Sequence, residues 1–211
     1  MSDFQNLKDA VLEGDENKTK ALVLEAVSQG GKAGDIMNKG LIAAMDIVGE
    51  KMESEEMFIP EVLMSATAMS AGVGALKPHL TSEDAVNQGV AVIGSVRGDL
   101  HDIGKNLVKM LLEGGGFDVI DLGTYVEPST FLSAVKDYNA TILGMSALLT
   151  TTMPAMKEVV ELLAENNIRE SVKVLVGGAP VTEAFCQEIG ADGYGADAGS
   201  AVRIAKTLIR E

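Results

Sequence analysis

The sequence predicts a helical domain followed by an α/β domain that contains a five-stranded parallel sheet. Two observations predict this organisation. Over the first 80 residues, apolar side chains recur at steps of three and four, which is helical spacing. From Gly89 onward, short apolar runs alternate with helical patterns, and this alternation is typical of a parallel sheet covered by helices on both faces. We therefore expect domains at residues 1–80 and 89–211, joined by a polar linker at 81–88.

Four helical segments make up the predicted first domain. Because the connections between them are short, they predict a four-helix bundle. The last segment starts near Pro60, and proline is tolerated in the first turn of a helix. The apolar positions are Phe4, Leu7, Val11 and Leu12 in the first segment, Leu22, Ala26 and Val27 in the second, Ile36, Met37, Gly40, Leu41, Ala44, Met45, Val48 and Met52 in the third, and Val62, Leu63, Ala66, Met69, Val73 and Leu76 in the fourth.

Five strands and five helices alternate in the predicted second domain. The first, third and fourth strands are apolar nearly throughout, as is typical of strands buried on both faces. In such a sheet, ligands bind beyond the carboxyl ends of the strands. Polar and small residues gather at those ends, in RGDLHDIGKN, SALLTTTMP, GGAP and YGADA. The predicted strands are 89–96, 117–121, 141–147, 173–177 and 192–195, and the predicted helices are 103–113, 128–137, 153–166, 182–189 and 198–208.

Composition excludes several classes of function. A formal net charge of -14 makes nucleic acid and anionic membranes poor partners. The single cysteine, Cys186, has no partner for an internal disulfide, which fits a reducing compartment. We expect no apolar run long enough to span a bilayer and no secretory signal, because the first residues lack a basic and apolar pattern. We therefore expect a cytoplasmic protein.

The loop after the first predicted strand does not match the phosphate-binding motifs. A P-loop needs four residues between its glycines and Ser or Thr after the lysine. Here five residues separate Gly98 from Gly104, and Asn106 follows Lys105. A dinucleotide fingerprint needs closely spaced glycines after the first strand, which this loop lacks. Phosphate binding is therefore a weak interpretation of this loop.

A metal-binding interpretation of the same loop is stronger. The chain has two histidines, and His101 lies in this loop between Asp99 and Asp102. One ring nitrogen of a neutral imidazole can bind a transition metal while the other donates to a carboxylate. A lone histidine does not hold a bare ion, because zinc sites take three or four protein ligands. The remaining ligands would have to come from a macrocycle. The alternative is a loop histidine beside a helix-capping aspartate, and His79 is interpreted as a surface residue.

Three linked motifs carry a resemblance to a known family. Asp99-x-His101-x-x-Gly104 is followed after 41 residues by Ser146-x-Leu148, and after 28 more by Gly177-Gly178. This set resembles the cobalamin-binding domains of B12-dependent methyltransferases and mutases, and its spacings suit that family. The resemblance implies a flavodoxin-like or Rossmann-like domain, with a doubly wound sheet, that binds cobalamin or a related corrinoid through its cobalt.

The first half resembles the methyl-transfer branch of that family. The segment MFIPEVLMSATAM is similar to the cap bundle that precedes the B12 domain in methionine synthase and in free-standing corrinoid proteins. The resemblance implies a stand-alone corrinoid carrier of a methanol-, methylamine-, betaine- or methoxy-aromatic-type system, as in methanogenesis or methylotrophic metabolism. Such a carrier alternates between cob(I)alamin and methylcobalamin. The implied partners are a substrate-specific methyltransferase, a second methyltransferase that passes the methyl group to a thiol or a pterin, and a reductive activase.

The resemblance also implies roles for three residues at the cobalt. The cofactor's own base is displaced, and His101 becomes the lower axial metal ligand. Asp99 orients His101, and Thr152 completes a relay of histidine, aspartate and hydroxyl. An alternative role for Thr152 is to cap the helix that starts near Met153.

The remaining predicted contacts with the cofactor form three groups. One group lies under the corrin ring, one lines a slot for the displaced nucleotide tail, and one belongs to the cap above the ring. The alternatives are a tight turn for the glycine pair and bundle core for the cap residues. The groups are Gly98, Leu100, Asp102, Ile103 and Gly104 under the ring, Ser146, Leu148, Thr150, Gly177, Gly178 and Ala198 around the tail, and Met52, Ile59 and Val62 in the cap.

Three other functions compete with the carrier. A B12-dependent sensor or regulatory module shares both halves but usually adds a DNA-binding domain, which we do not expect in this acidic chain. A mutase small subunit lacks the helical cap. A receiver-like signalling domain would use Asp99 as phosphoacceptor, but it leaves the Ser146 and Gly177 motifs unexplained.

Overall fold

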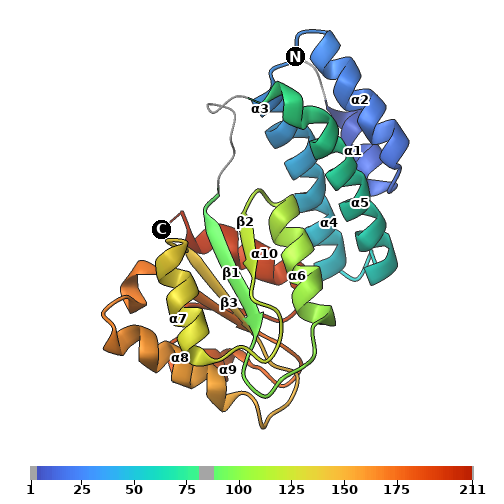
Figure 1. The fold of residues 1–211 in the computed structure, drawn as a ribbon. Coiled ribbons are helices and arrows are strands. Elements are labelled where there is room, and N and C mark those ends of the chain that lie inside the picture. The colour runs from blue at the N-terminus through green and yellow to red at the C-terminus, as the bar shows by residue number, and fades with distance from the viewer. Residues whose placement is uncertain (1–3, 81–87, 211) are drawn as a thin grey trace. The chain divides into compact units, whose positions relative to one another are not determined.

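A computed structural model of the chain describes residues 4–80 and 88–210 (Figure 1). The chain divides into a helical unit in its first part and an α/β unit in its second, and each is described by itself. Apart from residue 88, the predicted linker at 81–88 lies outside the described residues.

The helical unit is the predicted bundle of four helical segments. Asp15 starts the second of them, because its side chain accepts a hydrogen bond from the Lys18 backbone N–H at 2.9 Å. The last begins with Pro60 in its first turn and with the Glu61 carboxylate accepting the Phe58 N–H at 2.8 Å. The segments are α1 (Gln5–Leu12), α2 (Glu16–Ser28), the continuous run of α3 (Ala33–Asp35), η1 (Ile36–Ile42) and α4 (Ala43–Glu53), and α5 (Ile59–Leu76) with the short η2 (Lys77–His79).

The third segment contains a π-helical stretch that the sequence pattern did not reveal. In η1 the helix widens by about one residue per turn relative to an α-helix. Gly40 lies in this stretch, and a Cβ added there would lie 2.7 Å from the Leu7 side chain of α1. The glycine therefore lets α1 pack closely against the widened helix.

Helix α5 corrects one expectation from composition. The stretch Ile59–His79 is long and apolar enough to cross a membrane by length and composition alone, contrary to the expected absence of such a run. Core helices of bundles pass the same test. Several α5 side chains, including Val62 and Leu76, are fully buried.

The α/β unit is the predicted doubly wound parallel sheet. Its strand order is β2-β1-β3-β4-β5, and every neighbouring pair is parallel. Each predicted strand and helix is present with its bounds within one residue. The strands are β1 (Val90–Ser95), β2 (Asp118–Asp121), β3 (Ile142–Ser146), β4 (Lys173–Gly177) and β5 (Gly193–Gly195), and the helices are α6 (Ile103–Gly114), α7 (Pro128–Asp137), α8 (Pro154–Glu165), α9 (Glu183–Ile189) and α10 (Ala198–Leu208).

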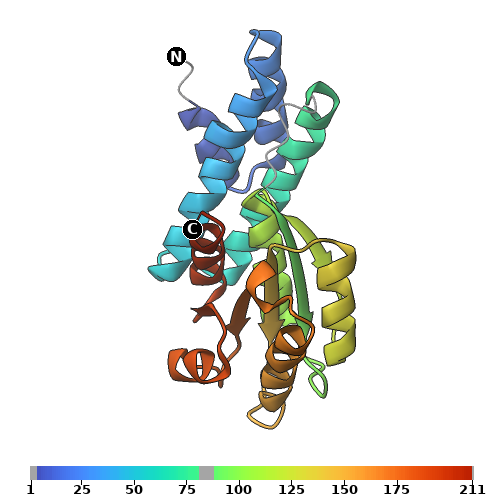
Figure 2. The same ribbon diagram turned by 90° about the vertical axis from the view of Figure 1, so that its left-hand side faces the viewer.

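The helices cover both faces of the sheet. Right-handed crossovers in this strand order put α6 on one face and α7, α8 and α9 on the other. Figure 2 shows α7 and α10 on opposite sides of the sheet. Phe131 of α7 and Met156 of α8 are fully buried in a core shared with Val92 and Leu143 of the sheet.

The register brings three strand ends to one edge. Ser95 at the end of β1 pairs with Ser146 at the end of β3, and Ser146 pairs with Gly177 at the end of β4. The strand order reverses between β1 and β3, because the chain leaves β1 toward β2 on one side and returns to β3 on the other. A ligand site is expected outside the carboxyl ends of these two strands.

Candidate functional site

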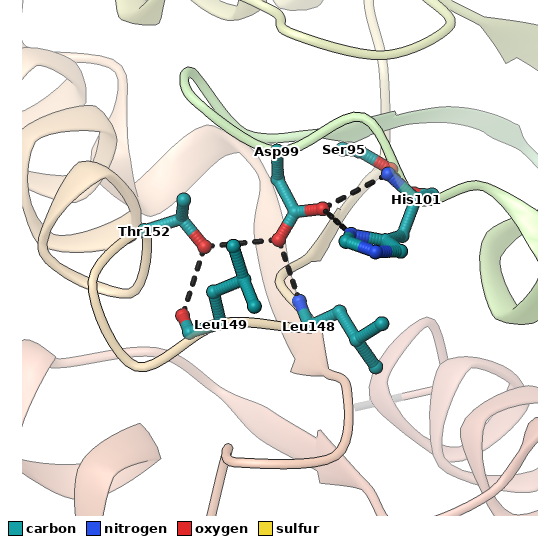
Figure 3. Close-up of polar contacts among 6 residues, drawn as sticks. All are labelled: Ser95, Asp99, His101, Leu148, Leu149 and Thr152. Atoms are coloured by element: carbon teal, nitrogen blue, oxygen red, sulfur yellow. Dashed lines mark hydrogen bonds and ion pairs between the residues drawn. The ribbon is translucent and has the colours of Figure 1, made fainter.

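Asp99 is the centre of a hydrogen-bond network at this edge (Figure 3). It lies in the loop after β1 and has no exposed surface. Its Oδ1 accepts the backbone N–H of His101 at 3.0 Å and lies 2.8 Å from Nδ1 of the His101 ring. Its Oδ2 accepts the backbone N–H of Leu148 at 2.6 Å and the Thr152 hydroxyl at 2.9 Å. One buried carboxylate therefore ties the loop after β1 to the loop after β3.

These hydrogen bonds keep Asp99 ionised. Burial raises the pKa of a carboxyl group, but the bonds from the His101 and Leu148 backbone, the His101 ring and the Thr152 hydroxyl outweigh burial and lower the pKa of Asp99 to about 2. An ionised carboxylate is a pure acceptor, so Nδ1 of His101 carries the proton in this contact. The lone pair of a neutral ring is then on Nε2.

The imidazole of His101 is fixed at one nitrogen and open at the other. Its side chain is 53% exposed, and within residues 4–80 and 88–210 no side chain or backbone group bonds Nε2. This is the arrangement of a metal-binding histidine whose second nitrogen is held by a carboxylate.

The structure contradicts the capping role considered for Thr152. Helix α8 begins at Pro154 with Met153 in the capping position and no side-chain cap bond. The Thr152 hydroxyl instead lies 2.9 Å from Asp99 Oδ2 and 2.8 Å from the Leu149 carbonyl oxygen. A hydroxyl has one proton for these two acceptors, so it can donate to only one of them at a time.

The surface around His101 is apolar and open. Leu100 and Ile103, on either side of His101 in the chain, are 71% and 77% exposed. Leu148 and Leu149 in the loop after β3 are also exposed. A Cβ added to Gly104 would meet nothing within 4 Å.

This surface fits a macrocyclic metal cofactor. In the part of the chain that the structure describes, no group of three or more His, Cys, Asp or Glu side chains is placed to hold a metal ion. One open imidazole surrounded by exposed aliphatic side chains suits a metal whose other ligands come from a flat, largely apolar ring.

The paired glycines at the end of β4 are required by the fold itself. A Cβ on Gly177 would lie 2.9 Å from the Gly195 carbonyl oxygen. Gly178 has a φ of +122°, and its Cβ would collide with the Ala147 carbonyl oxygen. Close packing against β5 thus accounts for Gly177, and the tight-turn interpretation accounts for Gly178. Gly98 also has a positive φ, of +86°, and lies close to the Thr152 methyl group.

The other predicted contacts lie apart from the Asp99 network. Ser146 is half-buried at the end of β3, Thr150 is exposed in the loop that follows, and Ala198 is buried at the start of α10. Asp102 is exposed and accepts a hydrogen bond from the Asn106 side chain at 3.1 Å. None of these four bonds the Asp99 carboxylate or the His101 ring among the described residues.

The three predicted cap residues belong to the helical unit and differ in exposure. Ile59 is 46% exposed and Met52 is partly buried. Val62 is fully buried, so the bundle-core interpretation accounts for it.

Sequence reasoning missed several groups that hold the loop after β1. The buried Ser95 hydroxyl donates to the His101 carbonyl oxygen at 2.6 Å. The Tyr125 N–H donates to the Asp99 carbonyl oxygen at 2.9 Å. Lys105 forms a buried ion pair with Asp121. Ser95 could have been noticed as a polar residue ending an apolar strand, whereas a backbone donor leaves no signal in the sequence.

Two family models match the chain, and both describe a B12 binding domain. One matches residues 89–203 and the other residues 4–77. The chain is 44% identical to the dimethylamine corrinoid protein of Methanosarcina barkeri, over 98% of this chain and 97% of that protein.

Solved structures of similar proteins share the fold. A cobalamin-binding protein from Desulfitobacterium hafniense DCB-2 matches with a TM-score of 0.85 and 32% identity, over 99% of both chains. A chain of the methanol:cobalamin methyltransferase complex MtaBC from Methanosarcina barkeri matches with a TM-score of 0.85 and 33% identity, over 98% of this chain and 79% of that one. Together with the open imidazole of His101, these matches show that the chain belongs to the B12-binding corrinoid proteins of methyltransferase systems, with a corrinoid as its cofactor.

Proposed function

We propose that this protein is a methyl carrier that binds its corrinoid with the cofactor's own base displaced and with His101 as the lower axial ligand of cobalt. The observation that carries the proposal is the His101 ring, held at Nδ1 by a buried, ionised carboxylate and free at Nε2. The corrinoid supplies a cobalt centre that accepts and releases a methyl group. The relatives whose names include dimethylamine and methanol support a methylamine- or methanol-type donor.

Asp99 and Thr152 are the groups that act through His101 in this proposal. Asp99 keeps the proton on Nδ1 and so keeps Nε2 available as a ligand. A carboxylate hydrogen-bonded to a ligand imidazole also makes the ligand more basic. Thr152 stabilises the charge on Asp99 when its hydroxyl donates to Oδ2. Release and return of His101 at the cobalt would therefore involve all three residues.

The remaining predicted residues keep their roles within this proposal. Leu100, Ile103 and Gly104 form the open apolar surface on which the ring would lie. Asp102 and Gly98 belong to the same loop. The tail would lie beside Ser146, Leu148, Thr150, Gly177, Gly178 and Ala198, and the cap would contribute Met52, Ile59 and Val62.

Val62 can contribute to the cap only if the bundle opens, because it is fully buried. In the same proposal residues 81–88 form a linker between the domains 1–80 and 89–211, and the protein is cytoplasmic. Its partners are a substrate-specific methyltransferase, a second methyltransferase that uses a thiol or a pterin, and a reductive activase.

Spectroscopy of His101→Ala tests the ligation. The wild-type protein should bind methylcobalamin in a one-to-one ratio and turn red, with the spectrum of an imidazole ligand. His101→Ala should shift this spectrum to that of the form without the lower ligand. His79→Ala, which changes the exposed second histidine, is the matched control and should leave the spectrum unchanged. An unchanged spectrum in His101→Ala would refute the ligation.

The methyl-carrier role is tested with the native partner. The tagged protein, loaded with corrinoid, should capture a methyltransferase from its host, and the captured pair should methylate the cobalt from one donor among methylamines, methanol, betaine and methoxy-aromatic compounds. Capture of a DNA-binding or signalling protein, with no methylation from any of these donors, would instead support the regulatory function.

A further inference from the structure

Lys105 is a buried lysine close in the chain to the proposed ligand His101, and the proposed function gives it no role. It lies in the first turn of α6, four residues after His101, and is 5% exposed. A buried ammonium group is costly unless it is paired and hydrogen-bonded, and lysine is seldom this buried. A lysine this buried beside the His101 loop therefore needs specific partners for its charge.

The Lys105 ammonium group is bound on two sides. Nζ donates to Asp121 Oδ1 at 2.7 Å and to Asn106 Oδ1 at 2.7 Å. Asp121 ends β2, and its Oδ1 also accepts the Gly123 N–H at 2.9 Å. Burial raises the pKa of the Asp121 carboxyl, but the hydrogen bonds from Lys105 and Gly123 outweigh burial and lower it below its usual value. The Asp121 carboxylate is therefore held in its ionised form, and the pair joins the start of α6 to the end of β2.

The first branch from Lys105 leads through Asp121 to the backbone of Asp99. Asp121 fixes the turn at Gly123, whose carbonyl oxygen accepts the Ser95 N–H at 3.0 Å. Two residues later, the Tyr125 N–H donates to the Asp99 carbonyl oxygen at 2.9 Å. The loop after β2 thus holds Asp99 at its carbonyl, while the loop after β3 holds it at its carboxylate.

The second branch leads through Asn106 to the residue after His101. The Asn106 side chain, held by Lys105, donates from Nδ2 to Asp102 Oδ2 at 3.1 Å. The Asn106 backbone N–H also donates to the Asp102 carbonyl oxygen at 2.7 Å. Both branches therefore end on residues that flank His101 within two positions along the chain.

We propose that Lys105 is a positioning residue for His101: its buried pair with Asp121 and its bond to Asn106 fix the backbone on both sides of the imidazole. This inference rests on the proposed function, because it concerns how firmly His101 is presented to cobalt. Lys105 does not touch His101 and acts only through the groups named above. Removing a residue that orients a metal ligand without touching the metal typically weakens metal binding about 10- to 100-fold.

Four variants separate positioning from a purely structural role. Lys105→Met removes the charge but keeps the length, and Lys105→Arg keeps the charge. Lys109→Met is the matched control, because Lys109 also faces Asp121 but at 3.5 Å and with a side chain 34% exposed. The double variant Lys105→Met/Asp121→Leu removes the whole pair, and such an apolar replacement often preserves stability.

Two measurements are made on each variant. The first is the pH at which imidazole leaves cobalt in the methylcobalamin-bound protein, followed by visible absorption. Lys105→Met and the double variant should raise this midpoint by about one pH unit, equal to about tenfold weaker ligation. The midpoints of Lys105→Arg and Lys109→Met should stay near the wild-type value.

The second measurement is the ¹⁵N NMR spectrum of the His101 ring without cofactor. It should show one dominant tautomer in wild type and a mixture of tautomers in Lys105→Met.

The outcomes are distinguishable. A wild-type protein whose spectrum never shows imidazole ligation contradicts the proposed function. If wild type shows ligation but Lys105→Met has the same midpoint and ring spectrum, Lys105 is not a positioning residue. If the double variant regains the wild-type midpoint, the effect of Lys105→Met comes from the Asp121 charge that has lost Lys105, and the inference is again overturned.

Discussion

Replacing Asp99 with Asn should destabilise the α/β unit in a pH-dependent way. The pKa of Asp99 is lowered from 3.8 to about 2. Each pKa unit corresponds to about 1.4 kcal/mol, so ionisation of this group contributes about 2 kcal/mol to folding at neutral pH. Because the folded-state pKa lies below the unfolded value, the contribution is complete above the unfolded pKa and is lost as the pH falls through 3.8 toward 2.

Asparagine adds a second, pH-independent cost. It has one acceptor oxygen, so its amide group must face either the Leu148 N–H or the His101 N–H, where the carboxylate accepted a hydrogen bond. The free-energy gap between wild type and Asp99→Asn should therefore be largest at neutral pH and should narrow on acidification without closing.

Urea unfolding followed by circular dichroism measures this gap. Both proteins are unfolded without cofactor at about pH 7, 5 and 3. The difference in their free energies of unfolding should shrink by about 1 kcal/mol between about pH 5 and about pH 3. Asp102→Asn is the control, because Asp102 is exposed three residues after Asp99 in the same loop, and the stability change of a surface substitution usually stays within about 0.5 kcal/mol. A gap that stays constant across this range would refute the claim that Asp99 is held ionised by its hydrogen bonds.

Two further predictions follow from the same geometry. Thr152→Val should lower the free energy of unfolding by about 1.5–3 kcal/mol, the usual value of a hydrogen bond to a charged group, as measured by urea unfolding. Thr152→Ser keeps the hydroxyl and should retain most of this stability. Wild-type stability in Thr152→Val would contradict the contribution of the hydroxyl. Gly178→Ala should greatly reduce the yield of folded protein, because the added Cβ would collide with the Ala147 carbonyl oxygen. Gly104→Ala should fold normally, because its Cβ would meet nothing within 4 Å, but it should weaken methylcobalamin binding in an equilibrium titration. Normal folding of the Gly178 variant would contradict the reason given for that glycine.

The sheet was predictable because its signals are local. Apolar runs such as the one that became β1 are short, continuous and bounded by polar loops, and their bounds were found to within one residue. The π-helical stretch η1 was not predictable, because apolar steps of three and four fit an α-helix and a locally widened helix equally well. The sequence also did not show which side of α5 is buried, since Val62 and Ile59 are both apolar but only Val62 is buried.

The candidate site was predictable where side chains carry it and unpredictable where the backbone does. Asp99, His101 and Thr152 were identified by residue type and motif, and the structure brings their polar atoms within hydrogen-bond distance. The N–H of Leu148 makes the shortest bond to Asp99, yet any residue except proline could supply it. Lys105 and Asp121 are 16 positions apart on different elements, so only the fold reveals their pairing.

The low pKa of Asp99 decides where a proton can go in the proposed cycle. If His101 held cobalt through Nε2, its Nδ1–H would still donate to an ionised carboxylate. Nδ1 of His101 lies 2.8 Å from the Asp99 carboxylate, so this contact would hold the ring whether or not it were bound to cobalt. Asp99 itself stays ionised at neutral pH, because its pKa is about 2. The proton in this contact therefore stays on Nδ1 of the histidine, and the aspartate would orient the ring in the bound and in the released state.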